Sequence, residues 1–228
     1  MIILLTRFLI VLFFCSAAGC VSSSVKHVNE SAQLISIPAA QQRIIDYHES
    51  GKYSRDVEAK AREVIAAADK AIASGVKYPA VVISVEDVLV STYDVRKKQG
   101  FSDNSCARKE LDSNVILGIL PVIKPSLNMF EYLLSRKVTV FIVSYRPESL
   151  RVSVLENLAG SGYSGWKGLY LLAPNQQADS KKFYEEIRKG LHRTGYNIVA
   201  TIGVLPFEVA GEQAGTPVLY PNYIYSAH

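Results

Sequence analysis

The feature that most constrains the fold is a series of short apolar runs separated by stretches with helical spacing. Val138–Ser144 is a continuous, largely β-branched run, which is typical of a strand buried on both faces of a sheet. Other strand-like runs lie at 80–85, 168–173, 197–203 and 217–221. Strands that alternate with helices indicate a parallel sheet with right-handed crossovers. We therefore expect an α/β fold with three layers, a Rossmann-like parallel sheet between helices, preceded by a helical N-terminal extension.

The helices are predicted from apolar residues three and four positions apart. The clearest begins near Ser54 and ends with Gly75 as a C-cap. Its apolar stripe consists of Val57, Ala61, Val64, Ile65, Ala68 and Ile72. Further helices are expected at 39–48, 125–136, 147–159 and 179–194, and one helical turn at 206–211. Residues 92–115 are polar without a clear period, so we expect a cap or loop region there.

The N-terminus has the pattern of a secretory signal. Arg7 precedes a short apolar stretch at 8–14, which is too short to span a bilayer comfortably. The small residues Ser16–Gly19 come next, and the resulting "AAGC" resembles a bacterial lipobox in which Cys20 becomes the lipidated first residue. We favour lipidation, and the alternative is an ordinary cleaved signal with an incidental cysteine. Acyl chains on Cys20 would hold the protein at a membrane surface.

This interpretation divides the chain into a lipoprotein signal peptide (1–19), a tether (20–38) and a folded domain (39–228). Cys15 leaves with the signal, so Cys106 has no partner and we expect no internal disulfide. The four histidines are dispersed and suggest no zinc site. Val21 follows Cys20, so no aspartate indicates retention in the inner membrane. We expect the lipid in the outer membrane of a bacterial cell envelope, with the domain facing the periplasm, as the family resemblance given below implies.

Charge and composition argue against one class of partner. The chain has 228 residues, is 49% hydrophobic and 20% charged, and carries a formal net charge of +4. Its basic residues are scattered, whereas a nucleic-acid-binding face would concentrate them. We therefore predict no nucleic-acid partner. The expected contacts are the membrane, through Cys20, and an unknown envelope protein or small phosphorylated ligand.

Several stretches resemble one family. The most specific is "SYRPESLRVSVLENLAGSGYSGWKGLYLL" at 144–172, and "YHESGKYSRDV" (47–57), "TGYNIVATIG" (194–203) and "PNYIY" (221–225) support it. Together they resemble the class B-like acid phosphatases of the haloacid dehalogenase superfamily, particularly bacterial lipoprotein acid phosphatases and plant vegetative storage relatives. The resemblance extends from about Gln41 to the end and implies a haloacid dehalogenase-type fold.

The resemblance implies a phosphatase site, but the expected nucleophile is missing. Such enzymes use an Asp nucleophile at the end of the first strand, a second Asp two residues later as acid and base, and Mg²⁺. Their "D-x-D-E-T" aligns with Ser84–Val88, which puts Ser84 at the nucleophile position and Glu86 at the acid/base position. A neutral hydroxyl cannot replace a carboxylate as nucleophile without a base. Taking Asp87 as nucleophile would put Leu89 at the acid/base position, so a register shift does not restore the motif.

The other motifs depart as well. The family's Gly-Asp-x-x-x-Asp reads Gly203 to Glu208, with Val204 at the first acid, so Glu208 is the remaining candidate metal ligand. Counting back from Gly195, the phosphate-neutralising lysine position falls on Tyr184. The candidates for binding a phosphate group are Ser144, Arg146, Lys181 and Lys182.

Three functions remain open. The favoured one is an acid phosphatase-like envelope lipoprotein that is catalytically inactive, needs no cofactor and binds a ligand or protein. The second is a Mg²⁺-dependent acid phosphatase that hydrolyses phosphomonoesters with a rebuilt active site. The third is a structural envelope lipoprotein without a small-molecule site. The loss of carboxylates at Ser84 and Val204 favours the first, because Mg²⁺ requires hard anionic oxygens.

Overall fold

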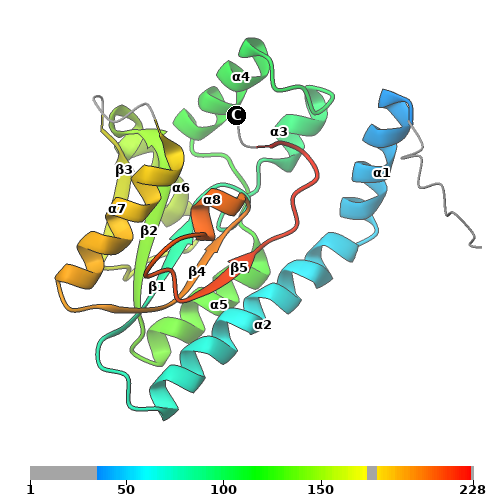
Figure 1. Ribbon diagram of the computed structural model, residues 1–228. Coiled ribbons are helices and arrows are strands. Elements are labelled where there is room, and N and C mark those ends of the chain that lie inside the picture. The colour runs from blue at the N-terminus through cyan, green and yellow to red at the C-terminus, as the bar shows by residue number, and fades with distance from the viewer. Residues whose placement is uncertain (1–34, 174–178, 227–228) are drawn as a thin grey trace, which may run out of the picture. The chain divides into compact units, whose positions relative to one another are not determined.

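A five-stranded parallel sheet forms the centre of the computed structural model, which describes residues 35–173 and 179–226 (Figure 1). The strand order is β3-β2-β1-β4-β5, and all four pairings are parallel. The strands are β1 (Pro79–Ser84), β2 (Thr139–Pro147), β3 (Gly168–Leu172), β4 (Asn197–Gly203) and β5 (Thr216–Leu219). The predicted α/β fold is confirmed.

The two faces of the sheet bury alternate side chains of each strand, as the pleat of a strand requires. On β1, Val81 and Ile83 join the larger hydrophobic cluster, while Ala80 and Val82 join the smaller one. The larger cluster is covered by α2 (Lys52–Ala73), α5 (Lys124–Ser135) and α6 (Arg151–Gly160), and the smaller one by α7 (Ser180–Arg193). The sheet therefore lies between two helical layers (Figure 1).

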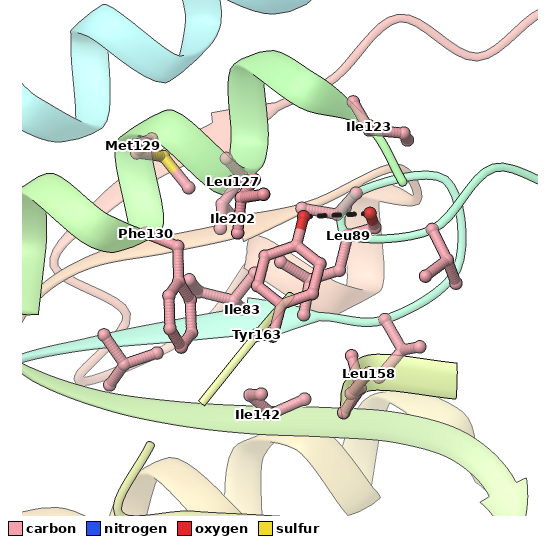
Figure 2. Close-up of a cluster of buried hydrophobic side chains, with 14 of the residues drawn as sticks. Ile83, Leu89, Ile123, Leu127, Met129, Phe130, Ile142, Leu158, Tyr163 and Ile202 are labelled. Carbon is pink, nitrogen blue, oxygen red and sulfur yellow. Dashed lines mark hydrogen bonds between the residues drawn. The ribbon is translucent and has the colours of Figure 1, made fainter. Parts of the chain in front are cut away.

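The larger cluster also fixes the turn that follows the first strand. Tyr163 is 1% exposed, and its hydroxyl donates to the carbonyl of Leu89 at 2.9 Å (Figure 2). Gly162 and Gly165 flank this tyrosine with φ angles of 90° and 84°, which side chains rarely adopt. The "SGYSGW" turn thus places a buried aromatic ring beneath the loop that carries the predicted catalytic residues.

Residues 92–115 are more regular than the sequence suggested. They contain α3 (Tyr93–Lys98) and most of α4 (Ser105–Ile116), so the prediction of an irregular segment was wrong. Asn104 caps α4 by accepting from the backbone N–H of Ala107 at 2.9 Å, and the helix buries Ala107, Leu111 and Val115. These three apolar residues are spaced four apart among polar ones. Because they are so few, the sequence pattern did not predict the helix.

The remaining helical elements are short or peripheral: α1 (Ile37–Glu49), the 3₁₀ turn η1 (Glu148–Leu150) and α8 (Pro206–Val209). The helix predicted at 39–48 is thus present, and Ser36 caps it. Residues Ser36–His228 form one compact unit. The predicted signal peptide, Cys20 and most of the tether lie outside the described residues. Within the described ranges, no helix combines the length and apolar character needed to cross a bilayer.

Candidate active site

The carboxyl ends of β1, β2 and β4 bring together the residues predicted from the phosphatase motifs. Ser84 is the last residue of β1 and is 2% exposed. It pairs in register with Val143, so the next residue of β2, Ser144, lies at the same end of the sheet. Two polar networks occupy this edge. We call Ser84, Tyr184 and Glu208 the inner network.

The inner network is closed on itself. The hydroxyl groups of Ser84 and Tyr184 share a hydrogen bond, and the Tyr184 hydroxyl donates to Glu208 Oε1 at 3.0 Å. Burial, followed by the Glu208 carboxylate, raises the pKa of Tyr184 well above its ordinary value, so the phenol remains protonated. Tyr184 thus occupies the position predicted for the lysine, with a neutral donor instead of a cation.

Glu208 is held by the backbone of its own loop. Its Oε2 accepts from the N–H groups of Val204 at 2.6 Å and Leu205 at 2.8 Å, which caps the first turn of α8. A Cβ at position 203 would lie 2.7 Å from Glu208 Cβ, so only Gly203 permits this approach. Burial raises the pKa of Glu208, and the two N–H groups oppose that rise. The carboxyl group predicted as a metal ligand is thus used in local structure.

Glu86, Ser144, Arg146 and Asp112 form the outer network. The hydroxyl of Ser144 donates to both carboxylate oxygens of Glu86, at 3.2 and 3.0 Å. Arg146 Nε donates to Glu86 Oε1 at 2.5 Å, and its second nitrogen donates to Asp112 Oδ1 on α4 at 2.6 Å. The backbone N–H of Arg146 also donates to Ser144 Oγ at 3.2 Å. The guanidinium therefore bridges β2 and α4 across the acid/base position.

The charge of Arg146 is secured by its two partners. Its side chain is 10% exposed, whereas that of Asp112 is 52% exposed. Burial lowers the pKa of Arg146, but the Glu86 and Asp112 carboxylates more than offset this and leave it raised. A fixed cation therefore stands beside Glu86, the acid at the acid/base position of the first motif.

The Asp87 carboxylate is engaged in hydrogen bonds that hold the structure together. It has a φ of 53° and accepts from the backbone N–H and hydroxyl of Thr92 at 2.7 and 2.6 Å and from the Tyr225 hydroxyl at 2.9 Å. Burial raises its pKa, opposed by the hydrogen bonds from Thr92 and Tyr225. Arg96 stacks over the Tyr225 ring, 4.1 Å from its centroid. Asp87 therefore ties the C-terminal tail to the loop after β1.

The two predicted phosphate-binding lysines are solvent-exposed on α7. The ammonium group of Lys181 lies 3.9 Å from Glu185. Lys182 lines a groove between β3 and α7, with a volume of about 860 Å³, whose floor includes Phe183, Ile187 and Leu191. Within the described part of the chain, neither lysine is recorded in a hydrogen bond or ion pair with the inner or outer network. Their role in binding phosphate remains a prediction.

The residues at this edge do not fit Mg²⁺, which requires several hard anionic oxygens. Ser84 and Val204 supply no carboxylate, Glu208 is satisfied by three protein donors, and Glu86 is paired with a guanidinium. In the described ranges, no cluster of three or more His, Cys, Asp or Glu side chains could hold a metal ion. The side chains at this edge therefore do not form a Mg²⁺ site.

Two participants were missed by sequence reasoning. Asp112 lies 34 residues from Arg146 in the chain, inside the segment that was taken as irregular, so nothing signalled the pair. Arg188 is fully buried on α7 and donates to the carbonyl oxygens of Glu208, at 2.8 Å, and Ala210. A charged residue within the helical stripe of α7 was the one available sign of this contact.

Parts of this chain are similar in sequence to known plant proteins. Vegetative storage protein 1 of Arabidopsis thaliana is 28% identical over 146 residues, which cover 63% of this chain and 54% of the relative. The stem 28 kDa glycoprotein of Glycine max is 26% identical over 148 residues, covering 63% and 58%. Both are plant proteins, and the chain spans little more than half of their length.

Solved structures support the same fold. The class C acid phosphatase from Bacillus anthracis superposes with a TM-score of 0.68 at 17% identity, covering 82% of this chain and 86% of the other. The same enzyme with tungstate bound gives a TM-score of 0.67. The sequence model of the HAD superfamily, subfamily IIIB (acid phosphatase) matches residues 14–225, nearly the whole chain. The chain therefore belongs to the acid phosphatase subfamily IIIB of the HAD superfamily.

Proposed function

We propose that this protein is an envelope lipoprotein that has kept the acid phosphatase fold, has lost phosphomonoester hydrolysis and acts by binding a ligand or a protein. The proposal combines the family fold, the lipobox-like sequence that ends at Cys20 and the state of the site. The family's chemistry requires a nucleophile, a metal site and a free acid. In this chain the residues at those positions make hydrogen bonds or ion pairs within the protein, or carry no carboxylate.

One observation carries the loss of hydrolysis. The Glu86 carboxylate, the sole acid at the first motif's catalytic positions, accepts from Ser144 Oγ and Arg146 Nε. To act as a general base for Ser84 it would have to abandon a charge-assisted hydrogen bond, which is among the stronger hydrogen bonds in proteins. Ser84 itself bonds to Tyr184, a phenol that stays protonated and cannot accept its proton.

The test is phosphatase activity of the detergent-solubilised full-length chain. We expect no hydrolysis of p-nitrophenyl phosphate above the background rate, from acidic to neutral pH, with or without Mg²⁺. Ser84→Ala and Glu86→Gln are run beside the wild type. Turnover that both substitutions abolish would overturn the proposal, because it would show a rebuilt site. Turnover that survives both would indicate a contaminating enzyme.

Phosphate binding without hydrolysis is the form of ligand recognition that the outer network supports. Arg146 presents a guanidinium, suited to phosphate, and its partner Asp112 is half-exposed and able to exchange with an incoming anion. Ser144 adds a hydroxyl beside it. The related class C enzyme is described with tungstate bound, so tungstate and orthophosphate are suitable calorimetric probes. Binding that is lost in Arg146→Ala would support this form of the proposal.

The second candidate is the Mg²⁺-dependent acid phosphatase with a rebuilt site. It is favoured by the convergence of Ser144, Glu86 and Arg146 at the edge where the family binds phosphate, together with family membership itself. It requires hydrolysis that depends on Mg²⁺ and disappears in Glu86→Gln, so the activity assay separates the two candidates.

The anchor is tested separately. We expect the wild-type chain to partition with outer membranes after expression in a Gram-negative host, and Cys20→Ala to prevent lipidation. The matched control is Cys106→Ser, which changes an exposed cysteine in the folded domain. If Cys20→Ala leaves the mass of the processed protein and its membrane fraction unchanged, the anchor is rejected while the account of the site stands.

A further inference from the structure

The C-terminal end of α4 carries an exposed apolar tip, Ile116–Ile119. The side chains of Ile116, Leu117 and Ile119 are 53%, 67% and 58% exposed. Between them, Gly118 has a φ of 67°, which turns the chain sharply. Such a concentration of exposed aliphatic side chains marks an interaction surface.

The tip is rigidly supported from below. Asn157, which is 3% exposed, donates to the carbonyl of Val115 at 2.6 Å and accepts from the N–H of Leu120 at 3.2 Å. Val115 and Leu120 point into the core, with exposures of 2% and 4%. The residues before and after the tip are therefore anchored, and those between them project outward. More than half of each of these three side chains is therefore left uncovered by the domain.

The chemistry of the tip suits a lipid surface. Residues 113–123 contain no charged side chain, so the tip itself would carry no ion into the interfacial region. None of its exposed residues lines the grooves beside α7, α2 or α1, so the tip projects and is not part of a groove. A protein partner would need a matching hollow, whereas a fluid bilayer accepts a projecting tip of any shape.

The chain outside the described residues supplies the second argument. The domain begins at Ser36, and α1 starts beside the connection between α3 and α4, where Gln41 Nε2 donates to the carbonyl of Gly100 at 2.8 Å. The chain thus enters the domain at the end where α3 and α4 lie (Figure 1). A segment from 21 to 35 spans at most about 50 Å, so a lipid on Cys20 would keep a bilayer within reach of this end.

We propose that the α4 tip is a second, reversible membrane contact that inserts Ile116, Leu117 and Ile119 into the bilayer interface. This inference rests on the proposed lipid anchor. Acyl chains on Cys20 would hold the chain at the bilayer but leave the domain free to rotate, and a second apolar contact would fix the orientation of the domain. The α4 end of the domain, next to Asp112 of the outer network, would then face the membrane.

The experiment places a tryptophan at the tip of the full-length chain. Leu117→Trp is made in a Trp166→Phe background, and the matched control is Leu219→Trp in the same background, at an exposed leucine of β5. Each protein is reconstituted with vesicles of phosphatidylethanolamine and phosphatidylglycerol that contain brominated acyl chains, which quench nearby tryptophan. We expect about a twofold loss of fluorescence for the tip and little change for the control.

The outcomes distinguish the tip from the anchor. If the protein floats with the vesicles and the two tryptophans are quenched equally little, the tip proposal is overturned and the anchor stands. If the protein does not float, the anchor fails. In that case vesicles are titrated into the protein that is not bound to membranes. If the emission spectrum of the tip tryptophan does not change, the tip proposal is rejected. If the protein forms a dimer as its concentration rises, and the tip tryptophan is not quenched in that dimer, a second copy covers the tip. The lipid proposal is then also overturned. Leu117→Ser, at a side chain that is 67% exposed, should weaken vesicle binding of the Cys20→Ala chain severalfold.

Discussion

The two networks at the carboxyl end of the sheet differ in what they can still exchange. In the inner network, Ser84, Tyr184 and Glu208 are all buried and bond to one another or to the backbone of their own loop. In the outer network, Arg146 joins a buried hydroxyl to Asp112, whose side chain is 52% exposed. The inner network has become part of the fold, whereas the outer one retains a cation that an anion could reach. Under the proposed function, a chain without hydrolytic activity could therefore still bind an anion at the outer network.

The largest effect is expected when the inner network is opened. Glu208→Ala leaves the N–H groups of Val204 and Leu205 and the Tyr184 hydroxyl without their acceptor in a buried site. We expect the free energy of unfolding to fall by about 3 kcal/mol, since each unsatisfied buried group costs roughly 1–3 kcal/mol. Urea denaturation measures it, with Glu186→Ala on the exposed face of α7 as the matched control. Equal, small losses in both variants would show that the inner network is not structural.

The inner network also predicts a pH dependence. Burial raises the folded-state pKa of Glu208 above its ordinary value of 4.5, so the folded protein binds a proton more tightly there than the unfolded chain. This residue's contribution to stability is therefore fully present below that ordinary value. It is lost as the pH rises toward and through the folded-state pKa. Glu208→Gln cannot ionise at this position. The free energy of unfolding of the wild type, relative to that of Glu208→Gln, should therefore decline as the pH rises through this window. If this difference grew with rising pH, the pKa of Glu208 in the folded protein would be lowered and not raised.

Much of this edge could be predicted from the sequence, because it follows the register of the strands. The apolar run of β2 ends at Ser144 and that of β1 at Ser84, and parallel pairing puts both at one edge. Counting from Gly195 also identified Tyr184, which the structure brings to Ser84 and Glu208. These positions depend on local periods and on fixed spacings, which a sequence displays.

The tertiary contacts of the site could not be predicted in the same way. The pairing of Arg146 with Asp112 depends on where α4 packs, and α4 itself was hidden in a polar segment. The sequence showed Glu86 as a retained acid, but its pairing with Arg146 depends on side-chain directions that no spacing reveals. Similarly, the role of Glu208 as a cap required the close approach that Gly203 permits.

A smaller effect is expected when the outer network loses its cation. Arg146→Ala removes the guanidinium from Glu86, whose side chain is 23% exposed and can regain water, so the loss should be about 1–2 kcal/mol. The control is Arg62→Ala, which breaks an exposed pair on α2 and should change stability by less than about 0.5 kcal/mol. Calorimetric phosphate binding should disappear in Arg146→Ala only. If stability falls by as much as in Glu208→Ala, the contrast between the two networks is wrong.

The smallest change in stability should come from Asp112, and it should move binding in the opposite direction. Asp112→Asn keeps an oxygen that can accept from Arg146 but removes the charge that competes with an incoming anion. The free energy of unfolding should change by less than about 0.5 kcal/mol, and the change should vanish at high salt. Phosphate affinity should rise about two- to threefold, the amount that one half-exposed ion pair is worth. Because Arg146→Ala abolishes binding and Asp112→Asn strengthens it, measuring both separates recognition by the guanidinium from general attraction to a basic protein. If Asp112→Asn weakens binding instead, the aspartate orients the guanidinium for the ligand and does not compete with it.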